Sequence, residues 1–420
     1  MSTRNTILVS LLILAISAPV LYQLGSPESI ERRGITPKAV VENHVRMAHA
    51  LYSASLTKAE HLLSSVETLI ATPSQDTLNQ ARKAYRALRI PYQQSEIMRW
   101  DSDFTAGRSV NRANSITSVD EWEGQVNAWP LDEGLIDYVA GEKSSADLNV
   151  IASDRPLTTE NIIALNGINN NEANVATGIH AIEFLLWGQD LNETRAGAGS
   201  RPFTDYDINN CSNQHCDRRA QYLLAVTQLL VSDLTRMVSE WDQTAMQTSG
   251  TLAHNVLNHP HGVDYIVGAM RSMATDELAS ARMASALMNN DTEEEHDCFS
   301  DLSHLANYYN FIGVKNAFYG DYGDVTGVGV ADLLKQQDSA VFEAIDEALS
   351  LIESDMSQLL LAGERSNPVR FDQVIGQDKT GPERIVAERA VTRLINLSQH
   401  FDRLHEALSL SDLALGGDGD

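Results

Sequence analysis

One short segment of the chain places an imidazole and a carboxylate at helical spacing. The segment reads Gly178-Ile-His180-Ala-Ile-Glu183, and the residues around it are apolar. Residues three apart on a helix share a face, so His180 and Glu183 would point the same way. Burying a carboxylate is costly unless it is paired or bound to a cation. The pair therefore predicts two ligands of a metal ion, while a His–Glu hydrogen bond in the core would explain the same residues.

These two side chains cannot complete a metal site alone. A zinc peptidase uses three protein ligands and a water, and the segment lacks the second histidine of a His-Glu-x-x-His motif. Other helices must supply the remaining ligands, and Glu96 and Asp301 are the best candidates. Glu96 lies three residues before Arg99, so the two would share a helix face and could form an ion pair instead.

Two further stretches combine carboxylates with other polar side chains. Asp132 and Glu133 follow an aromatic turn, and either a ligand role or N-capping would explain Asp132. Ser300 and His304 flank Asp301, and Ser300 would alternatively cap the helix that follows. The acidic run just before them, residues 293–297, could be only a solvated turn. Arg99, Asp132, Ser300 and His304 are therefore candidate ligand-binding residues.

The elements that must position these residues are helices. Apolar residues recur at helical spacing along the chain, and no region alternates as a strand would. Ser74 is expected to cap a helix. We predict an all-α fold of two helical-bundle halves, at 36–246 and 250–412, which could be a diverged duplication. Long helices are expected at about 217–246, 262–289, 301–318, 330–363 and 382–410.

Composition narrows the choice of partners. The 420 residues include 31 Lys and Arg against 57 Asp and Glu, so the net charge is −26. Such a chain repels phosphate backbones, which argues against a nucleic-acid partner and leaves cations as candidates. With 43% hydrophobic residues, the chain can bury a large core.

The first 24 residues indicate export. A basic residue precedes an apolar run at 7–20, which is typical of a signal peptide, and an uncleaved N-terminal anchor is the alternative. The membrane would then be contacted only through this segment. An exported protein can form disulfides, and Cys211 and Cys216 are close enough in sequence to pair, which would leave Cys298 free.

Taken together, these stretches resemble the imelysin-like family. Its Gly-x-His-x-x-Glu hallmark is met by Gly178, His180 and Glu183, and similar stretches recur in the family's order over about residues 38–410. Ser95 stands where threonine is usual, and Leu302-Ser303 replaces Asn-Thr. The resemblance implies two bundle-like halves with a site between them, secretion to the periplasm or outer membrane of a Gram-negative bacterium, and a link to envelope iron-uptake proteins.

Three functions agree with these features. The first is an extracytoplasmic metal-binding protein for iron acquisition, with iron as the expected ion and zinc or calcium as alternatives, because one imidazole among carboxylates suits harder metals. The second is a metallopeptidase in which Glu96 or Glu133 would act as general base. The third is a binding protein for a non-metal organic ligand, held by Arg99, His180 and His304.

Overall fold

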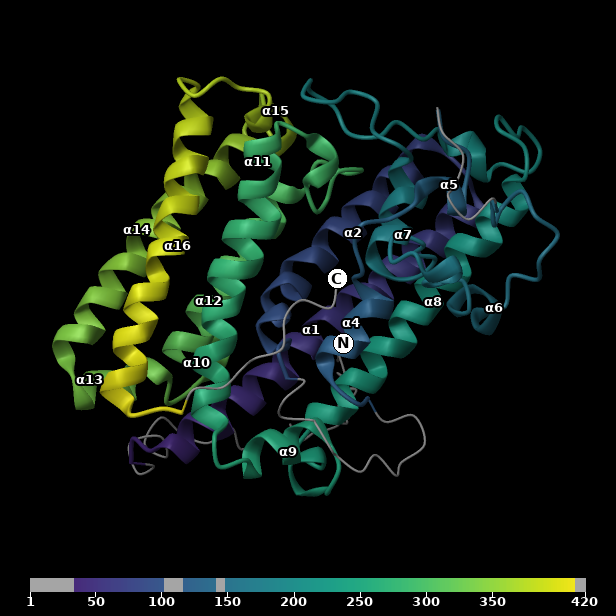
Figure 1. Cartoon of the computed structure of the whole chain (residues 1–420). Coiled ribbons are helices and arrows are strands. Elements are labelled where there is room, and N and C mark those ends of the chain that lie inside the picture. Colours follow the sequence, from purple (N-terminus) through teal and green to yellow (C-terminus); the bar gives the residue numbers. More distant parts are fainter. Residues whose placement is uncertain (1–33, 102–115, 141–147, 412–420) are drawn as a thin grey trace, which may run out of the picture. The chain divides into compact units, whose positions relative to one another are not determined.

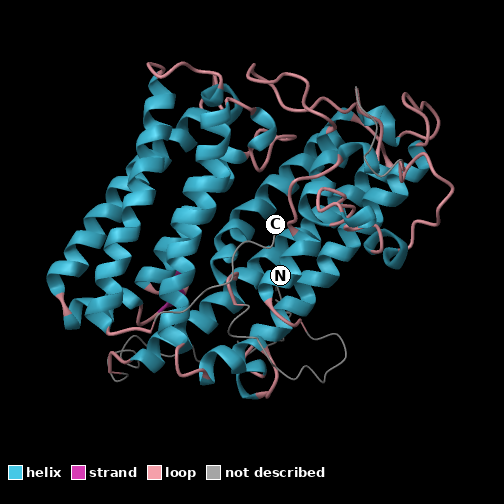
Figure 2. Ribbon diagram, in the orientation of Figure 1, coloured by secondary structure: helices cyan, strands magenta, loops and turns pink. Residues whose placement is uncertain are grey.

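Helices form most of the fold, and the predicted all-α class is confirmed (Figures 1 and 2). The computed structural model describes residues 34–101, 116–140 and 148–411. Within these ranges, the strands are β1 (Asp321–Tyr322) and β2 (Val325–Thr326), which form one short antiparallel hairpin. The described residues from Ile35 onward make one compact unit. The division into bundles at 36–246 and 250–412 and the duplication stay predictions.

Three long helices organise the first part of this unit: α1 (Pro37–Ala71), α2 (Gln75–Ser95) and α8 (Cys216–Trp241). α1 packs against both of the others and buries an apolar stripe along its length. Ser74 caps α2 as predicted, because its side chain accepts a hydrogen bond from the Thr77 amide. Shorter elements complete this part: η2 (Glu96–Met98), α4 (Val119–Val126), α5 (Glu133–Ile136), α6 (Thr159–Ile163), η3 (Ile168–Asn170), α7 (Gly178–Trp187), η4 (Phe203–Tyr206) and η5 (Ala245–Gln247).

The second part also consists of helices, with two departures from the prediction. The helix expected at 262–289 contains a π-helical segment, η6 (Met273–Ala284). The single helix expected at 330–363 is wrong, because Asp338 caps a new helix there and accepts hydrogen bonds from two amides. The elements are α9 (Leu252–Asn258), α10 (Gly262–Ser272), α11 (Ser285–Asn289), η7 (Thr292–Glu294), α12 (Ser303–Tyr319), α13 (Val330–Gln337), α14 (Ser339–Glu364), α15 (Phe371–Ile375) and α16 (Pro382–Leu408).

The two parts meet where α12 packs against α2 (Figure 1). Asn310 on α12 donates a hydrogen bond of 2.9 Å to the backbone carbonyl of Gln93 on α2. Gly313, one turn further on, comes so close that an added Cβ would lie 2.8 Å from the Gln94 carbonyl. The side chains of the candidate site lie beside this contact.

Two predictions about the whole chain have different outcomes. The pairing of Cys211 with Cys216 is confirmed, and Cys298 is a buried free thiol. The predicted signal peptide or anchor at residues 1–24 lies outside the described residues. No helix within the described ranges has both the length and the hydropathy needed to cross a membrane.

Candidate metal centre

The His-x-x-Glu pair lies on α7, a short helix that is buried along its whole length. Gly178 begins the helix with φ of 84°, and an added Cβ there would lie 2.5 Å from the Val126 carbonyl oxygen. Only glycine combines that backbone conformation with so close an approach. Gly178 therefore lets α7 start against α4, which sets where His180 and Glu183 point.

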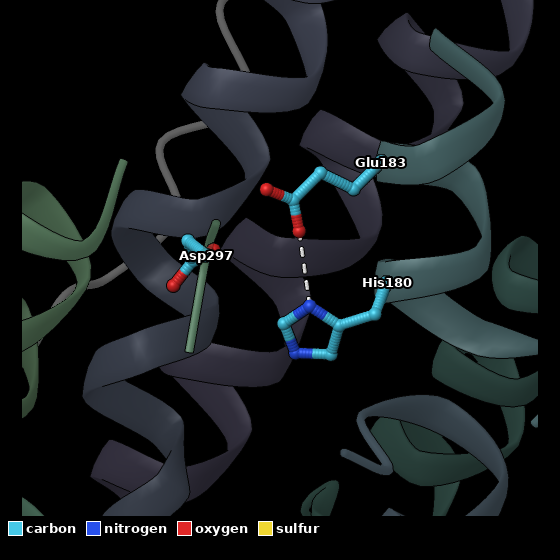
Figure 3. A group of neighbouring side chains, drawn as sticks. All are labelled: His180, Glu183 and Asp297. Atoms are coloured by element: carbon cyan, nitrogen blue, oxygen red, sulfur yellow. Dashed lines mark hydrogen bonds and ion pairs between the residues drawn. The ribbon is translucent and has the colours of Figure 1, made fainter. Parts of the chain in front are cut away.

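His180 and Glu183 converge with a third side chain, Asp297 (Figure 3). Each offers one donor atom, and the three atoms lie within 4.8 Å of one another. The His180 Nδ1 is 3.0 Å from the Glu183 Oε2, and all three residues are 0% exposed. Asp297 comes from the loop before α12, and its backbone amide donates to the Ser303 hydroxyl at 3.0 Å. This is the one such group among the described residues.

Neutral donors hold the Glu183 carboxylate in place. Ser300 donates to Oε1 twice, from its backbone amide at 3.0 Å and from its hydroxyl at 2.5 Å. The Tyr85 hydroxyl on α2 donates to Oε2 at 3.1 Å. These bonds fix the carboxylate beside His180 without neutralising its charge.

Burial controls the protonation of His180 and Glu183. It lowers the pKa of His180 to about 3, with a further contribution from Arg89. It also raises the pKa of Glu183 to about 8, and the nearby Asp297 adds to that shift. His180 is therefore a neutral imidazole at neutral pH, which is the form that binds metals. Glu183 is a carboxyl group that needs a proton or another cation.

These residues fit a metal ion. The His180 Nε2 is buried and has no hydrogen-bond partner in the described part of the chain, which calls for an explanation. One imidazole with two carboxylates is a donor set used for divalent metals and iron. His180, Glu183 and Asp297 would hold the ion, and the ion would supply the missing positive charge.

One positive side chain already contacts this group. Arg89 on α2 places Nη2 2.7 and 2.8 Å from the two carboxylate oxygens of Asp297. Its Nη1 donates to the Asn127 Oδ1 at 3.0 Å, and the side chain is fully buried. Arg89 compensates the negative charge of Asp297 directly. It also lowers the pKa of Glu183, but burial and Asp297 outweigh that effect, so the pKa of Glu183 stays raised.

The structure places Glu96 and Arg99 in a neighbouring network of buried charges and outside the group of three. Glu96 accepts a hydrogen bond of 2.5 Å from Arg282, and Arg99 lies 3.6 Å from Glu277 and 3.5 Å from Asp120. The π-helix η6 contributes to this network. Its wider turn places residues five apart on the same face, so the Arg282 Nε lies 2.6 Å from the Glu277 Oε1.

Asp132 and Glu133 lie at the start of α5. Asp132 caps this helix, because its Oδ1 accepts from the Leu135 amide at 3.2 Å. Burial raises the pKa of Glu133 to about 8, and the charge of Glu293 adds to the effect. The structure does not bring either residue into the group of three.

The residues after Asp297 have separate partners. Ser300 contacts Glu183, whereas Asp301 accepts from the Arg370 guanidinium at 3.3 Å. Burial, reinforced by Asp372, raises the pKa of Asp301 to about 8. His304 lies 2.9 Å from Glu364 through its Nε2. α12 begins at Ser303, so Ser300 is not its cap.

Sequence reasoning missed Asp297 and Arg89. Asp297 ends the acidic run at 293–297, which a solvated turn would explain, yet it is 0% exposed. The apolar Cys298 and Phe299 that follow it were the available signal of burial. Arg89 carried no local signal, because its partner is supplied by a distant part of the chain.

Comparisons with known proteins match one family model and two solved structures of similar fold. A family model described as Imelysin matches residues 48–400. A crystal structure described as an iron-regulated protein A precursor from Parabacteroides distasonis superposes with a TM-score of 0.61 at 17% identity, covering 88% of this chain and 94% of that one. An imelysin-like protein from Psychrobacter arcticum gives a TM-score of 0.57 at 14% identity, covering 89% and 97%. A search among curated proteins gave no match.

Proposed function

The chain belongs to the imelysin family, and we propose that it is an extracytoplasmic metal-binding protein that serves iron acquisition or homeostasis. The observation that carries this proposal is the convergence of His180, Glu183 and Asp297 within 4.8 Å in a fully buried setting. Export is supported by the apolar segment near the N-terminus. The iron-regulated protein from Parabacteroides distasonis, which has the same fold, supports a link with iron.

The charge around Glu183 supports a cation over an anionic organic ligand. Its hydrogen-bond partners among the described residues are neutral groups, namely Ser300, Tyr85 and His180. An added anion would meet two carboxylates in a medium that screens charge poorly. A bound cation would instead replace the proton that burial favours on Glu183. The ion would come from the medium, and envelope iron-uptake proteins would be its donor or acceptor.

The metallopeptidase alternative needs Glu96 or Glu133 as a base beside the metal. Glu96 is already bound to Arg282 at 2.5 Å, and Glu133 is outside the group of three. No contact of the described residues favours that role, so peptide cleavage by the metal-loaded protein is an outcome to be measured. Loss of cleavage in Glu183→Gln would support a peptidase.

The experiment that tests the proposal is elemental analysis of protein purified without chelator or nickel. The wild type is compared with the double variant His180→Ala/Glu183→Ala. A matched control is His304→Ala/Glu364→Ala, which removes another His–Glu pair with a contact of 2.9 Å. We expect near-stoichiometric metal in the wild type and the control, and none in the site variant. Absence of metal from all three, even after incubation with ferrous iron, zinc and calcium, would refute the proposal.

A further inference from the structure

A second imidazole lies against His180. His296 directly precedes Asp297 and is 3% exposed. Its ring centroid is 4.5 Å from that of His180, and the two rings are nearly perpendicular, at 88°. The Trp129 ring packs on both, with centroids 5.1 Å from His180 and 6.2 Å from His296. The two histidines come from distant parts of the chain and share one buried space.

In both imidazole rings the same atom, Nε2, lacks a hydrogen-bond partner in the described part of the chain. In each ring Nδ1 has a partner: Glu183 at 3.0 Å for His180, and for His296 both the Arg89 guanidinium at 3.3 Å and the Asp297 carboxylate at 3.4 Å. In each ring Nε2 is buried and has no hydrogen-bond partner in the described part of the chain. A histidine whose Nδ1–H is held by a carboxylate is oriented to offer Nε2 to a metal. Glu183 stands in that relation to His180, so with the ion at Nε2 it orients the ring and Asp297 remains the carboxylate ligand.

We propose that His296 is a second imidazole donor of the metal centre, acting through Nε2 beside the Nε2 of His180. This inference rests on the proposed function and makes the site more specific. His296 lies outside the group of three donor atoms, so it must turn about its side-chain torsions to reach the ion. This rotation gives up the Nδ1 contacts with Arg89 at 3.3 Å and with Asp297 at 3.4 Å in exchange for a metal–ligand bond.

The second imidazole changes which ions the centre prefers. Carboxylates with one imidazole suit hard cations as well as borderline ones. Two imidazoles with the carboxylate of Asp297 form the donor set typical of non-haem ferrous iron, and zinc also accepts it. Calcium prefers oxygen ligands alone. The site should therefore select ferrous iron or zinc over calcium.

Another buried histidine shows that an unused nitrogen alone is not enough. His44 on α1 is 2% exposed, and neither of its ring nitrogens has a hydrogen-bond partner in the described part of the chain. Its ring packs edge-on against Tyr265, with centroids 5.9 Å apart. No carboxylate makes a metal-binding group with it among the described residues. His44 is thus a matched control for removing a buried imidazole.

The test counts the imidazole rings that coordinate a bound Cu²⁺ ion. Wild-type protein is loaded with one equivalent of Cu²⁺, and electron spin echo spectroscopy records how many imidazole rings couple to it. We expect two rings in the wild type, one in His296→Gln and two in His44→Gln. Competition with a chromogenic chelator under anaerobic conditions should show that His296→Gln weakens Fe²⁺ binding at least about tenfold, and that His44→Gln leaves it unchanged.

The outcomes separate the two proposals. A single coupled imidazole in the wild type overturns the role of His296 and needs no variant, so a variant that fails to fold does not leave the question open. Unchanged Fe²⁺ affinity in His296→Gln, with a far-UV spectrum and melting curve like the wild type, also overturns it. If the wild type binds neither Cu²⁺ nor Fe²⁺, the proposed metal-binding function itself fails.

Discussion

The ion pair between Arg89 and Asp297 connects the stability of the fold to the candidate metal centre. Both side chains are 0% exposed, and the guanidinium lies 2.7 and 2.8 Å from the two carboxylate oxygens. Arg89 belongs to α2, and Asp297 to the loop before α12. The change Arg89→Met keeps an unbranched, apolar stem and removes the charged guanidinium.

The expected loss of stability follows from the groups that lose Arg89 as a partner. Without Arg89, Asp297 is a buried carboxylate with no compensating charge, and Asn127 loses a donor at 3.0 Å. Removing one partner of a buried ion pair typically costs about 3–5 kcal/mol. We expect the free energy of unfolding to fall by about that amount, out of the roughly 5–15 kcal/mol typical of a domain. The double variant Arg89→Met/Asp297→Asn should recover part of it, because the orphaned charge is gone.

Metal binding should stabilise the Arg89→Met variant more than it stabilises the wild type. Arg89→Met leaves one more uncompensated negative charge at the site, so a divalent cation should bind more tightly. A ligand that binds only the folded state stabilises it by RT ln(1 + [L]/Kd). Zinc should therefore raise the unfolding free energy of the variant by more than that of the wild type.

Urea unfolding followed by circular dichroism, with and without zinc, measures both effects. Arg271→Met, which removes an exposed ion pair with Asp402, is the control and should cost no more than about 1 kcal/mol. A loss below about 1 kcal/mol in Arg89→Met would refute the assigned energetics of the buried pair. Equal zinc-induced gains in variant and wild type would refute the view that Arg89 and the metal compensate the same group of charges.

Three further predictions concern neighbouring features. Gly178→Ala should lower stability and metal content together, because the new Cβ would lie 2.5 Å from the Val126 carbonyl at φ of 84° and push α7 away; thermal melting and elemental analysis check this. Glu133→Gln should stabilise the protein increasingly as the pH rises from about 4.5 to about 8, measured by melting at several pH values. The raised pKa of Glu133 means that its ionisation destabilises the folded state across that window, and a pH-independent gain would contradict this reasoning. Replacing Cys211 and Cys216 by serine should cost about 2 kcal/mol, given their short loop, in urea unfolding without reductant.

Local patterns were sufficient to predict the fold class and two of the three residues of the candidate centre, His180 and Glu183. Helical spacing of apolar residues indicated the long helices, and Ser74 marked the start of one of them. The spacing of His180 and Glu183 predicted a shared helix face, and the two side chains are 3.0 Å apart. These features depend on residues within one or two helical turns, so the sequence contains them directly.

The remaining parts of the centre depend on contacts that no local pattern encodes. Asp297 reaches the site because its loop is held through Ser303 and Arg89, and these come from different helices. The partner of Glu96 is Arg282 on a π-helix, whose extra residue per turn does not show in the hydrophobic period. Each of these requires knowing which helices pack together.

The two His–Glu pairs show why pairing alone does not define a metal site. His304 and Glu364 are 2.9 Å apart, but Glu364 also accepts from Arg86 at 2.6 Å and is partly exposed. The hydrogen bond from His304, together with Arg86, lowers the pKa of Glu364 to about 2, so its charge is already compensated. Glu183 is fully buried, is held by neutral donors, and its pKa is raised to about 8. The same two residue types thus give a closed ion pair in one place, and in the other a site that still requires a cation.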